Sequence, residues 1–178
     1  MYIISEQLKY KLCVFGEQGV GKTSLTRRFV TKTFKEDLKM TIGTDITKKS
    51  LEVDGKNVIL QIWDFAGEDK YQVLFPSFVK GAHGGIFMYD ITREKSLKNI
   101  ENWLSFFKDI QGILSVPIII VGGKIDLENL RIINMEQAID MAQLHNLDGY
   151  FECSSKTGQN VEKIFESITR FMIKKTGM

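Results

Sequence analysis

A glycine-rich stretch near the start of the chain carries the clearest chemistry in the sequence. It runs from Gly16 to Thr23 with the spacing G-x-x-x-x-G-K-[ST], between an apolar run and a segment with helical spacing. Glycines let the backbone curl so that successive N–H groups point at phosphate oxygens, and the N-terminus of the following helix favours an anion. Lys22 would add a positive charge and Thr23 a hydroxyl for Mg²⁺. The stretch predicts a phosphate-binding loop.

A second signal begins where a β-rich run ends, at Asp64. A carboxylate at this place can hold Mg²⁺ through water, and the N–H of Gly67, three residues later, can reach a terminal phosphate. The pattern D-x-x-G is weak evidence alone and becomes strong downstream of a phosphate-binding loop. Thr41, in a stretch without periodicity, offers a second hydroxyl for the metal.

Two later segments have the chemistry of purine recognition. Asp126 could accept hydrogen bonds from the N1–H and the exocyclic amine of guanine, a donor pair that adenine lacks, so its carboxylate would select the base. The stem of Lys124 can lie across one face of the ring. After the last predicted strand, a backbone N–H within 154–156 can donate to guanine O6. Taken alone, 123–126 is better interpreted as a polar loop with a helix cap.

Strand and helix patterns alternate along the chain, which is typical of a parallel sheet with helices on both faces. Asp54-Gly55 predicts a hairpin, so one strand should run antiparallel at an edge. We expect a doubly wound α/β fold with six strands, five parallel and one antiparallel, and five helices, with ligands at the carboxyl ends of the strands. The expected strands are Lys9–Phe15, Thr44–Val53, Asn57–Asp64, Gly84–Asp90, Pro117–Val121 and Tyr150–Cys153. The expected helices are Gly21–Lys32, Tyr71–Val79 with a kink at Pro76, Leu97–Phe107, Asn134–His145 and Val161–Met172.

Bulk composition narrows the class of protein. The 178 residues are 43% hydrophobic and 26% charged, which fits one soluble domain. The near balance of 24 basic and 22 acidic side chains gives no indication of nucleic-acid binding. Cys13 and Cys153 lie in apolar runs and should be reduced core thiols. No signal peptide opens the chain, and its longest aliphatic run, 116–121, is too short to span a bilayer, so we expect a cytoplasmic protein.

In their order and spacing these motifs resemble those of the Ras superfamily of small GTPases, and the resemblance covers essentially the whole chain. It implies that residues 1–178 form a single P-loop NTPase domain. The segments 41–45, 60–64 and 80–84 look most like the Rab branch. The resemblance implies a switch that binds GTP or GDP with Mg²⁺, hydrolyses GTP slowly and acts in membrane traffic or signalling. Two switch loops, 33–43 and 67–80, would relax on hydrolysis. It also implies contact with the cytosolic face of a membrane.

The resemblance also assigns roles to individual residues. Nucleotide contacts would come from Gln18, Gly19, Val20, Gly21, Lys22, Thr23, Ser24, Phe34, Thr41, Gly67, Lys124, Asp126, Ser154, Ser155 and Lys156. Mg²⁺ would be held by Thr23, Thr41 and Asp64, and the catalytic roles would fall to Lys22, Thr41, Gly67 and Glu68. Effector, exchange and activating proteins would contact the two switch loops and an apolar triad made of Ile46, Trp63 and Phe78. The protein would be a monomer.

Three positions depart from the superfamily pattern. Glu68 stands where relatives carry the glutamine that orients the attacking water; it keeps an acceptor, loses the amide donor and adds negative charge, so we expect slow turnover. The alternative is that Glu68 works as a general base. Gln18 replaces a small residue and would either crowd the γ-phosphate or point to solvent. Gly123 replaces an asparagine that contacts the purine and braces the phosphate loop, a loss of roughly ten- to a hundredfold in affinity.

The C-terminal residues contain no cysteine to carry the prenyl group that Rab-branch relatives use, so membrane contact would need a missing tail or a partner. The leading hypothesis is an enzyme and switch. The alternative is a Rab-like GTP-binding module that recruits effectors with little or no hydrolysis. A P-loop kinase is a third possibility without supporting segments in the sequence.

Overall fold

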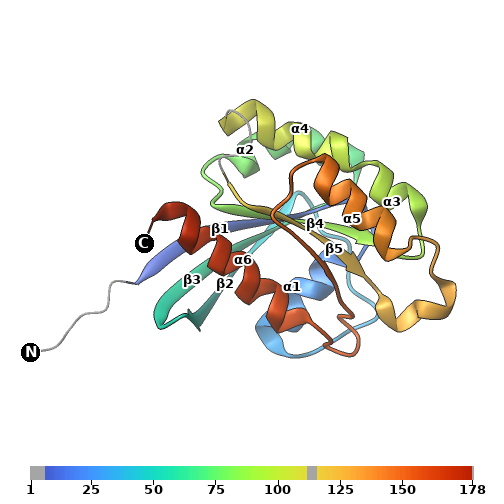
Figure 1. Cartoon of the computed structure of the whole chain (residues 1–178), viewed down its shortest axis with the longest axis horizontal. Coiled ribbons are helices and arrows are strands. Elements are labelled where there is room, and N and C mark those ends of the chain that lie inside the picture. Colours follow the sequence, from blue (N-terminus) through green and yellow to red (C-terminus); the bar gives the residue numbers. More distant parts are fainter. Residues whose placement is uncertain (1–6, 112–115, 178) are drawn as a thin grey trace, which may run out of the picture.

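A single mixed sheet forms the centre of the computed structural model, which describes residues 7–111 and 116–177. The strands are β1 Leu8–Phe15, β2 Thr44–Val53, β3 Lys56–Phe65, β4 Gly84–Asp90, β5 Ile118–Gly123 and β6 Gly149–Glu152. Their order is β2-β3-β1-β4-β5-β6, and only β2 and β3 pair antiparallel (Figure 1). The predicted sheet, with five parallel strands and one antiparallel, is therefore confirmed. The expectation about a signal peptide falls on residues 1–6, outside the described chain.

The hairpin between β2 and β3 turns where the sequence predicts it. Asp54 has φ 51° and Gly55 has φ 74°. A two-residue turn of type I′ needs positive φ at both central residues, and its twist matches that of the flanking strands. The turn therefore fixes β2 as an antiparallel edge strand beside β3, at one end of the sheet.

The described residues contain six α-helices, where the sequence analysis expected five. They are α1 Lys22–Thr31, α2 Phe75–Val79, α3 Glu94–Lys98, α4 Ile100–Gln111, α5 Met135–Leu144 and α6 Val161–Thr176. The extra helix arises because Asn99, with φ −80° and ψ 6°, separates α3 from α4. Apolar spacing could not reveal this break, since Leu97 and Ile100 are buried on both sides of it.

Helix boundaries elsewhere follow local chemistry. The predicted helix at 71–79 is divided into a 3₁₀ segment, Asp69–Leu74, and α2. Pro76 lies in the first turn of α2, where its missing N–H leaves no hydrogen bond unmade. Asn134 and Gln137 form the expected capping box at the start of α5.

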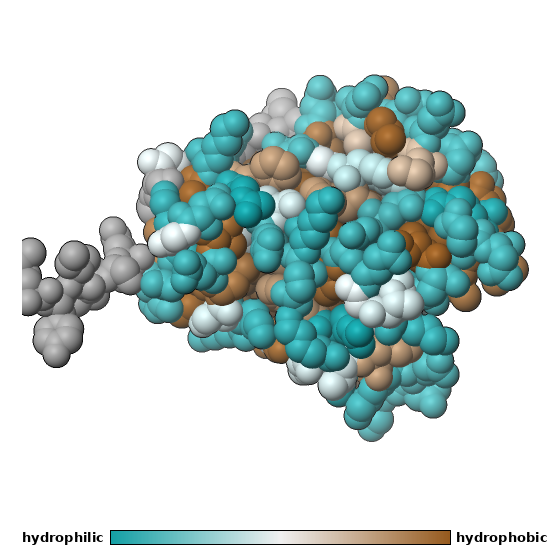
Figure 2. Space-filling model, turned by 60° about the horizontal axis from the view of Figure 1, so that its bottom comes forward, coloured by the Kyte–Doolittle hydropathy of each residue, from teal (hydrophilic) through white to brown (hydrophobic). Residues whose placement is uncertain are grey.

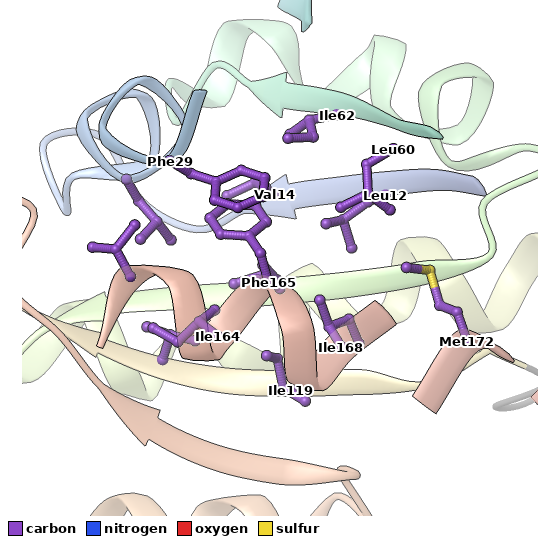
Figure 3. Close-up of a cluster of buried hydrophobic side chains, with 14 of the residues drawn as sticks. Leu12, Val14, Phe29, Leu60, Ile62, Ile119, Ile164, Phe165, Ile168 and Met172 are labelled. Atoms are coloured by element: carbon purple, nitrogen blue, oxygen red, sulfur yellow. The ribbon is translucent and has the colours of Figure 1, made fainter. Parts of the chain in front are cut away.

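Helices cover both faces of the sheet (Figure 1). α1 and α6 pack on one face, where Phe29 and Phe165 stack with ring centroids 3.9 Å apart (Figure 3). The other four α-helices pack on the opposite face, around a second cluster of buried residues. Cys13 and Cys153 are buried free thiols, as predicted. The doubly wound arrangement leaves the carboxyl ends of the parallel strands free to carry a site.

The surface combines polar side chains with exposed large hydrophobic ones, among them Ile42, Val73 and Leu144. The face seen in Figure 2 is largely hydrophilic, with apolar side chains in separate patches. Among the described helices, none combines the length and the apolar character needed to cross a membrane.

Candidate nucleotide-binding site

A cavity of about 470 Å³ opens where the loops after β1, β3, β5 and β6 meet. Predicted nucleotide and catalytic residues line it: Gln18, Gly19, Val20, Gly21, Lys22, Thr23, Ser24, Phe34, Thr41, Gly67, Glu68, Lys124, Asp126, Ser155 and Lys156. The remaining two, Asp64 and Ser154, hydrogen-bond to lining residues. The fold thus gathers every predicted site residue at one edge of the sheet.

The phosphate loop curls around its own lysine. Gly16, at φ 139°, begins the curl, and a Cβ there would lie 2.2 Å from the carbonyl oxygen of Met88, so only glycine fits. Lys22 is 5% exposed, and its ammonium group donates a hydrogen bond of 2.7 Å to the carbonyl oxygen of Glu17. Burial lowers the pKa of Lys22 to about 8. A bound anion would restore the charge balance of this buried cation.

Three oxygen-bearing side chains meet beside the loop, each from a different part of the chain. The hydroxyl of Thr23, in α1, lies 3.0 Å from the hydroxyl of Thr41 and donates to Oδ2 of Asp64 at 2.5 Å. The other carboxylate oxygen of Asp64 is buried without a hydrogen-bond partner in the described chain. Burial raises the pKa of Asp64 to about 6. Hydroxyl oxygens and a buried carboxylate oxygen without a hydrogen-bond partner are the ligands that a hard divalent cation such as Mg²⁺ prefers.

The segment after β3 lies directly against the phosphate loop. A Cβ on Gly67 would come within 2.2 Å of the backbone nitrogen of Gln18. Since the obstruction is backbone, any side chain at position 67 would push the two segments apart. Glycine at this position therefore lets the backbone of the second loop approach the place where a terminal phosphate would be held.

The far end of the cavity holds the predicted base-binding residues. Asp126 accepts a hydrogen bond of 2.6 Å from the hydroxyl of Ser154, which fixes the orientation of its carboxylate. The hydroxyl of Ser155 is buried and has no partner in the described chain. Lys156 pairs with Glu36 at 3.2 Å, joining the loop after β6 to the loop before β2. An oriented acceptor and an unpaired buried hydroxyl suit a polar heterocycle.

Lys124 has a partner that the sequence analysis missed. Its ammonium group lies 2.7 Å from Oδ2 of Asp90, a carboxylate that is 1% exposed at the end of β4. The signal was present, because Asp90 was predicted to end a strand at the same edge as Asp64. Burial opposes ionisation, but hydrogen bonds from Lys124 and Thr92 outweigh it and lower the pKa of Asp90.

Other lining residues come from the loop before β2. Lys35, Glu36, Leu38, Lys39 and Met40 line the cavity. The resemblance indicated a nucleotide-covering position only at Leu38, and no pattern indicated the other four. The amide nitrogen of Gln18 lies 2.7 Å from the sulfur of Met40. Gln18 is therefore exposed, lines the cavity and contacts the opposite loop, and both expectations for its effect on a γ-phosphate stay predictions.

Glu68 lines the cavity and is ion-paired. Its Oε2 lies 2.8 Å from the ammonium group of Lys70, which is 60% exposed. The pair partly offsets the negative charge that Glu68 brings to the phosphate end of the site. An exposed pair of this kind is screened by water and contributes little energy.

The apolar triad is assembled on the surface beside the two loops. Ile46 on β2 lies opposite Trp63 on β3, and the rings of Trp63 and Phe78 have centroids 6.1 Å apart. The ammonium group of Lys11 lies 3.6 Å from the centroid of the Trp63 ring. The three side chains thus form one continuous patch, although they come from three elements.

Comparisons with known proteins agree with this geometry. The sequence model of the Ras family matches residues 11–174. The chain is 38% identical to Ras-related protein Rab-13 of Canis lupus familiaris over 168 residues, which are 94% of this chain and 82% of that protein. Ras-related protein Rab-7a of Dictyostelium discoideum is 38% identical over 92% of this chain and 82% of its own length. Ras-related protein Rab-1 of Theileria parva is 37% identical over 90% of this chain and 73% of its own length.

Proposed function

The chain belongs to the Ras family, and from that premise we propose that its cavity binds GTP or GDP together with one Mg²⁺ ion. Within the family it is a Rab-like small GTPase, an enzyme and switch that hydrolyses GTP to GDP and phosphate. The similarity to these GTPases does not favour the alternative of a GTP-binding module with little or no hydrolysis. Slow turnover and a role in membrane traffic are part of the proposal.

One observation carries the metal and phosphate part of the proposal. The hydroxyls of Thr23 and Thr41 and the carboxylate of Asp64 converge beside the buried ammonium group of Lys22. A divalent cation there would neutralise charge on the outer phosphates, which is the main requirement of phosphoryl transfer. Thr41 and Gly67 then lie where they can contact a γ-phosphate, and its loss would release the two segments that carry them.

The base end supports selection of guanine. Asp126, held by Ser154, would accept the two donors on the guanine edge, while the stem of Lys124 and the ring of Phe34 would contact the purine. The segment 154–156 would supply the donor to O6. We propose these residues as the specificity determinants of the site.

We attribute the expected slow hydrolysis of GTP to Glu68. Changing Glu68→Gln should raise the single-turnover rate of bound GTP about tenfold, because it supplies an amide donor for the water and removes a negative charge near the phosphoryl group. A like charge at roughly 5 Å costs about 1 kcal/mol even in water. The measurement is phosphate release from GTP-loaded protein after Mg²⁺ addition.

A matched variant separates charge from hydrogen bonding. Lys70→Ala removes the cation that pairs with Glu68, so it should slow the wild-type protein and leave the Glu68→Gln variant unchanged. If Glu68→Gln instead slows hydrolysis, Glu68 acts as a general base and the expectation of an impaired position is wrong.

Magnesium dependence should change with pH through Asp64. Since the pKa of this carboxyl is raised to about 6 in the metal-free protein, a proton competes with Mg²⁺ below that pH and the carboxylate is free to help hold the metal above it. The Mg²⁺ concentration that half-maximally slows GDP release should therefore rise about tenfold between pH 7 and pH 5. The same titration on Asp64→Asn should show a weak, nearly pH-independent response. A pH-independent wild-type response would contradict the metal assignment.

The remaining proposals concern partners and organisation. We propose that the apolar triad and the two switch loops form the surface for effector, exchange and activating proteins, supported by the continuity of Ile46, Trp63 and Phe78. Residues 1–178 would form one G domain acting as a monomer. We also propose contact with the cytosolic face of a membrane.

A further inference from the structure

Arg93 makes a contact with the phosphate loop that the proposed function does not use. The residue lies just before α3, and its Nη2 donates a hydrogen bond of 2.8 Å to the backbone carbonyl oxygen of Gln18. The guanidinium also reaches within 4.0 Å of the position a Cβ on Gly19 would occupy. Arg93 therefore holds the loop from outside through its backbone.

The same arginine shares a buried carboxylate with Lys124. Oδ2 of Asp90 lies 3.4 Å from Nε of Arg93 and 2.7 Å from the ammonium group of Lys124. Oδ1 accepts hydrogen bonds from the backbone N–H and the hydroxyl of Thr92, at 2.9 and 2.7 Å. With both oxygens satisfied, Asp90 joins Arg93, which contacts the phosphate loop, to Lys124 on the base-binding segment.

A side chain at position 123, where such a link could otherwise be made, would have to displace the side chain of Met88. A Cβ on Gly123 would lie 2.5 Å from the terminal methyl of Met88 and 3.1 Å from the carbonyl oxygen of Val20. The Met88 side chain thus fills the space between β5 and the phosphate loop with apolar atoms. A polar connection between the two segments must run elsewhere.

We propose that Arg93, held by Asp90, is a positioning residue that ties the phosphate loop to the base-binding segment in place of a polar side chain at position 123. The proposal rests on the proposed function, since it concerns the same nucleotide site. Arg93 contacts the loop through its backbone and is not among the residues that line the cavity, so its removal should selectively weaken binding of the outer phosphates.

The test compares GDP and GMP binding to Arg93→Ala and to the wild type. The dissociation constant for GDP should rise roughly ten- to thirtyfold, within the range for a lost charge-assisted hydrogen bond. The constant for GMP should rise less than about threefold, because GMP lacks the β-phosphate that the loop would hold. Arg93→Lys keeps a donor and should recover part of the GDP affinity. Merely structural damage would change both constants by the same factor.

Two further variants make the test specific. Lys98→Ala breaks an exposed ion pair with Glu94 within α3 and should leave the dissociation constants for GDP and GMP unchanged. The double variant Gly123→Asn, Met88→Val introduces an amide side chain at position 123 and shortens the side chain that would clash with it. In that background Arg93→Ala should change the dissociation constant for GDP less than threefold.

The proposal is overturned if Arg93→Ala leaves GDP binding within twofold of the wild type, or if GDP and GMP binding weaken equally. Failure of the wild-type protein to bind GDP would instead refute the proposed function, so the two failures are distinguishable.

Discussion

Replacing Lys22 with alanine is expected to lower the affinity for GDP by roughly thirtyfold to a few thousandfold, the range for truncating one partner of a buried, hydrogen-bonded charge pair. Lys22 is the one lysine buried in the described chain, and it lies inside the curl of the phosphate loop. The exposed lysines of the cavity, such as Lys35, cannot replace a desolvated charge at that place. Titration with a fluorescent GDP analogue gives the constant directly.

The matched control for this variant is Lys163→Ala, which removes an exposed lysine on α6 far along the chain. It should bind GDP as the wild type does. Because burial already lowers the pKa of Lys22, its removal should not unfold the protein, and thermal unfolding without nucleotide checks this. Unchanged GDP affinity in a folded Lys22→Ala protein would contradict the phosphate assignment.

Replacing Asp126 with alanine is expected to abolish discrimination between bases. A site built to hydrogen-bond a substrate group rejects an analogue that lacks the group by about 10⁴-fold or more. Without the carboxylate, the ratio of ADP to GDP dissociation constants should fall to about ten, mostly through loss of GDP affinity. Calorimetric titration with each diphosphate measures both constants without a labelled competitor.

Asp126→Asn provides a stricter version of this prediction. The side chain keeps its size, but one acceptor becomes a donor, which matches a purine with a carbonyl in place of the guanine amine. Preference should therefore move from GDP to xanthosine diphosphate. A variant that still prefers GDP over both alternatives would show that Asp126 does not read the base edge.

The parts of the site that lie in continuous motifs could be predicted from sequence. The phosphate loop, the Asp64–Gly67 segment and the Asp54-Gly55 turn each depend on backbone geometry that a few adjacent residues determine. The mixed sheet with one antiparallel edge strand followed from the alternation of strand and helix patterns together with that hairpin, whereas the strand order was not predicted. Their convergence at one edge followed from the rule for parallel sheets.

The contacts that sequence could not reveal join residues far apart in the chain. Arg93 reaches Gln18 across 75 positions, and Lys156 reaches Glu36 across 120. The break between α3 and α4 at Asn99 also involves a contact between distant residues, because the Asn99 side chain donates a hydrogen bond to the carboxylate of Glu17 in the phosphate loop. Helical spacing records only which side of a segment is buried, so it cannot register such tertiary contacts.

The most direct test of the account is a competition experiment on the wild-type protein in Mg²⁺. A labelled GDP analogue is bound at the site, and unlabelled GDP and ADP are titrated against it. GDP should displace the label at near-stoichiometric concentration, and ADP should fail to do so at a thousandfold excess. Displacement by ADP at concentrations similar to those of GDP would contradict a guanine-nucleotide site formed by Asp126 and the phosphate loop.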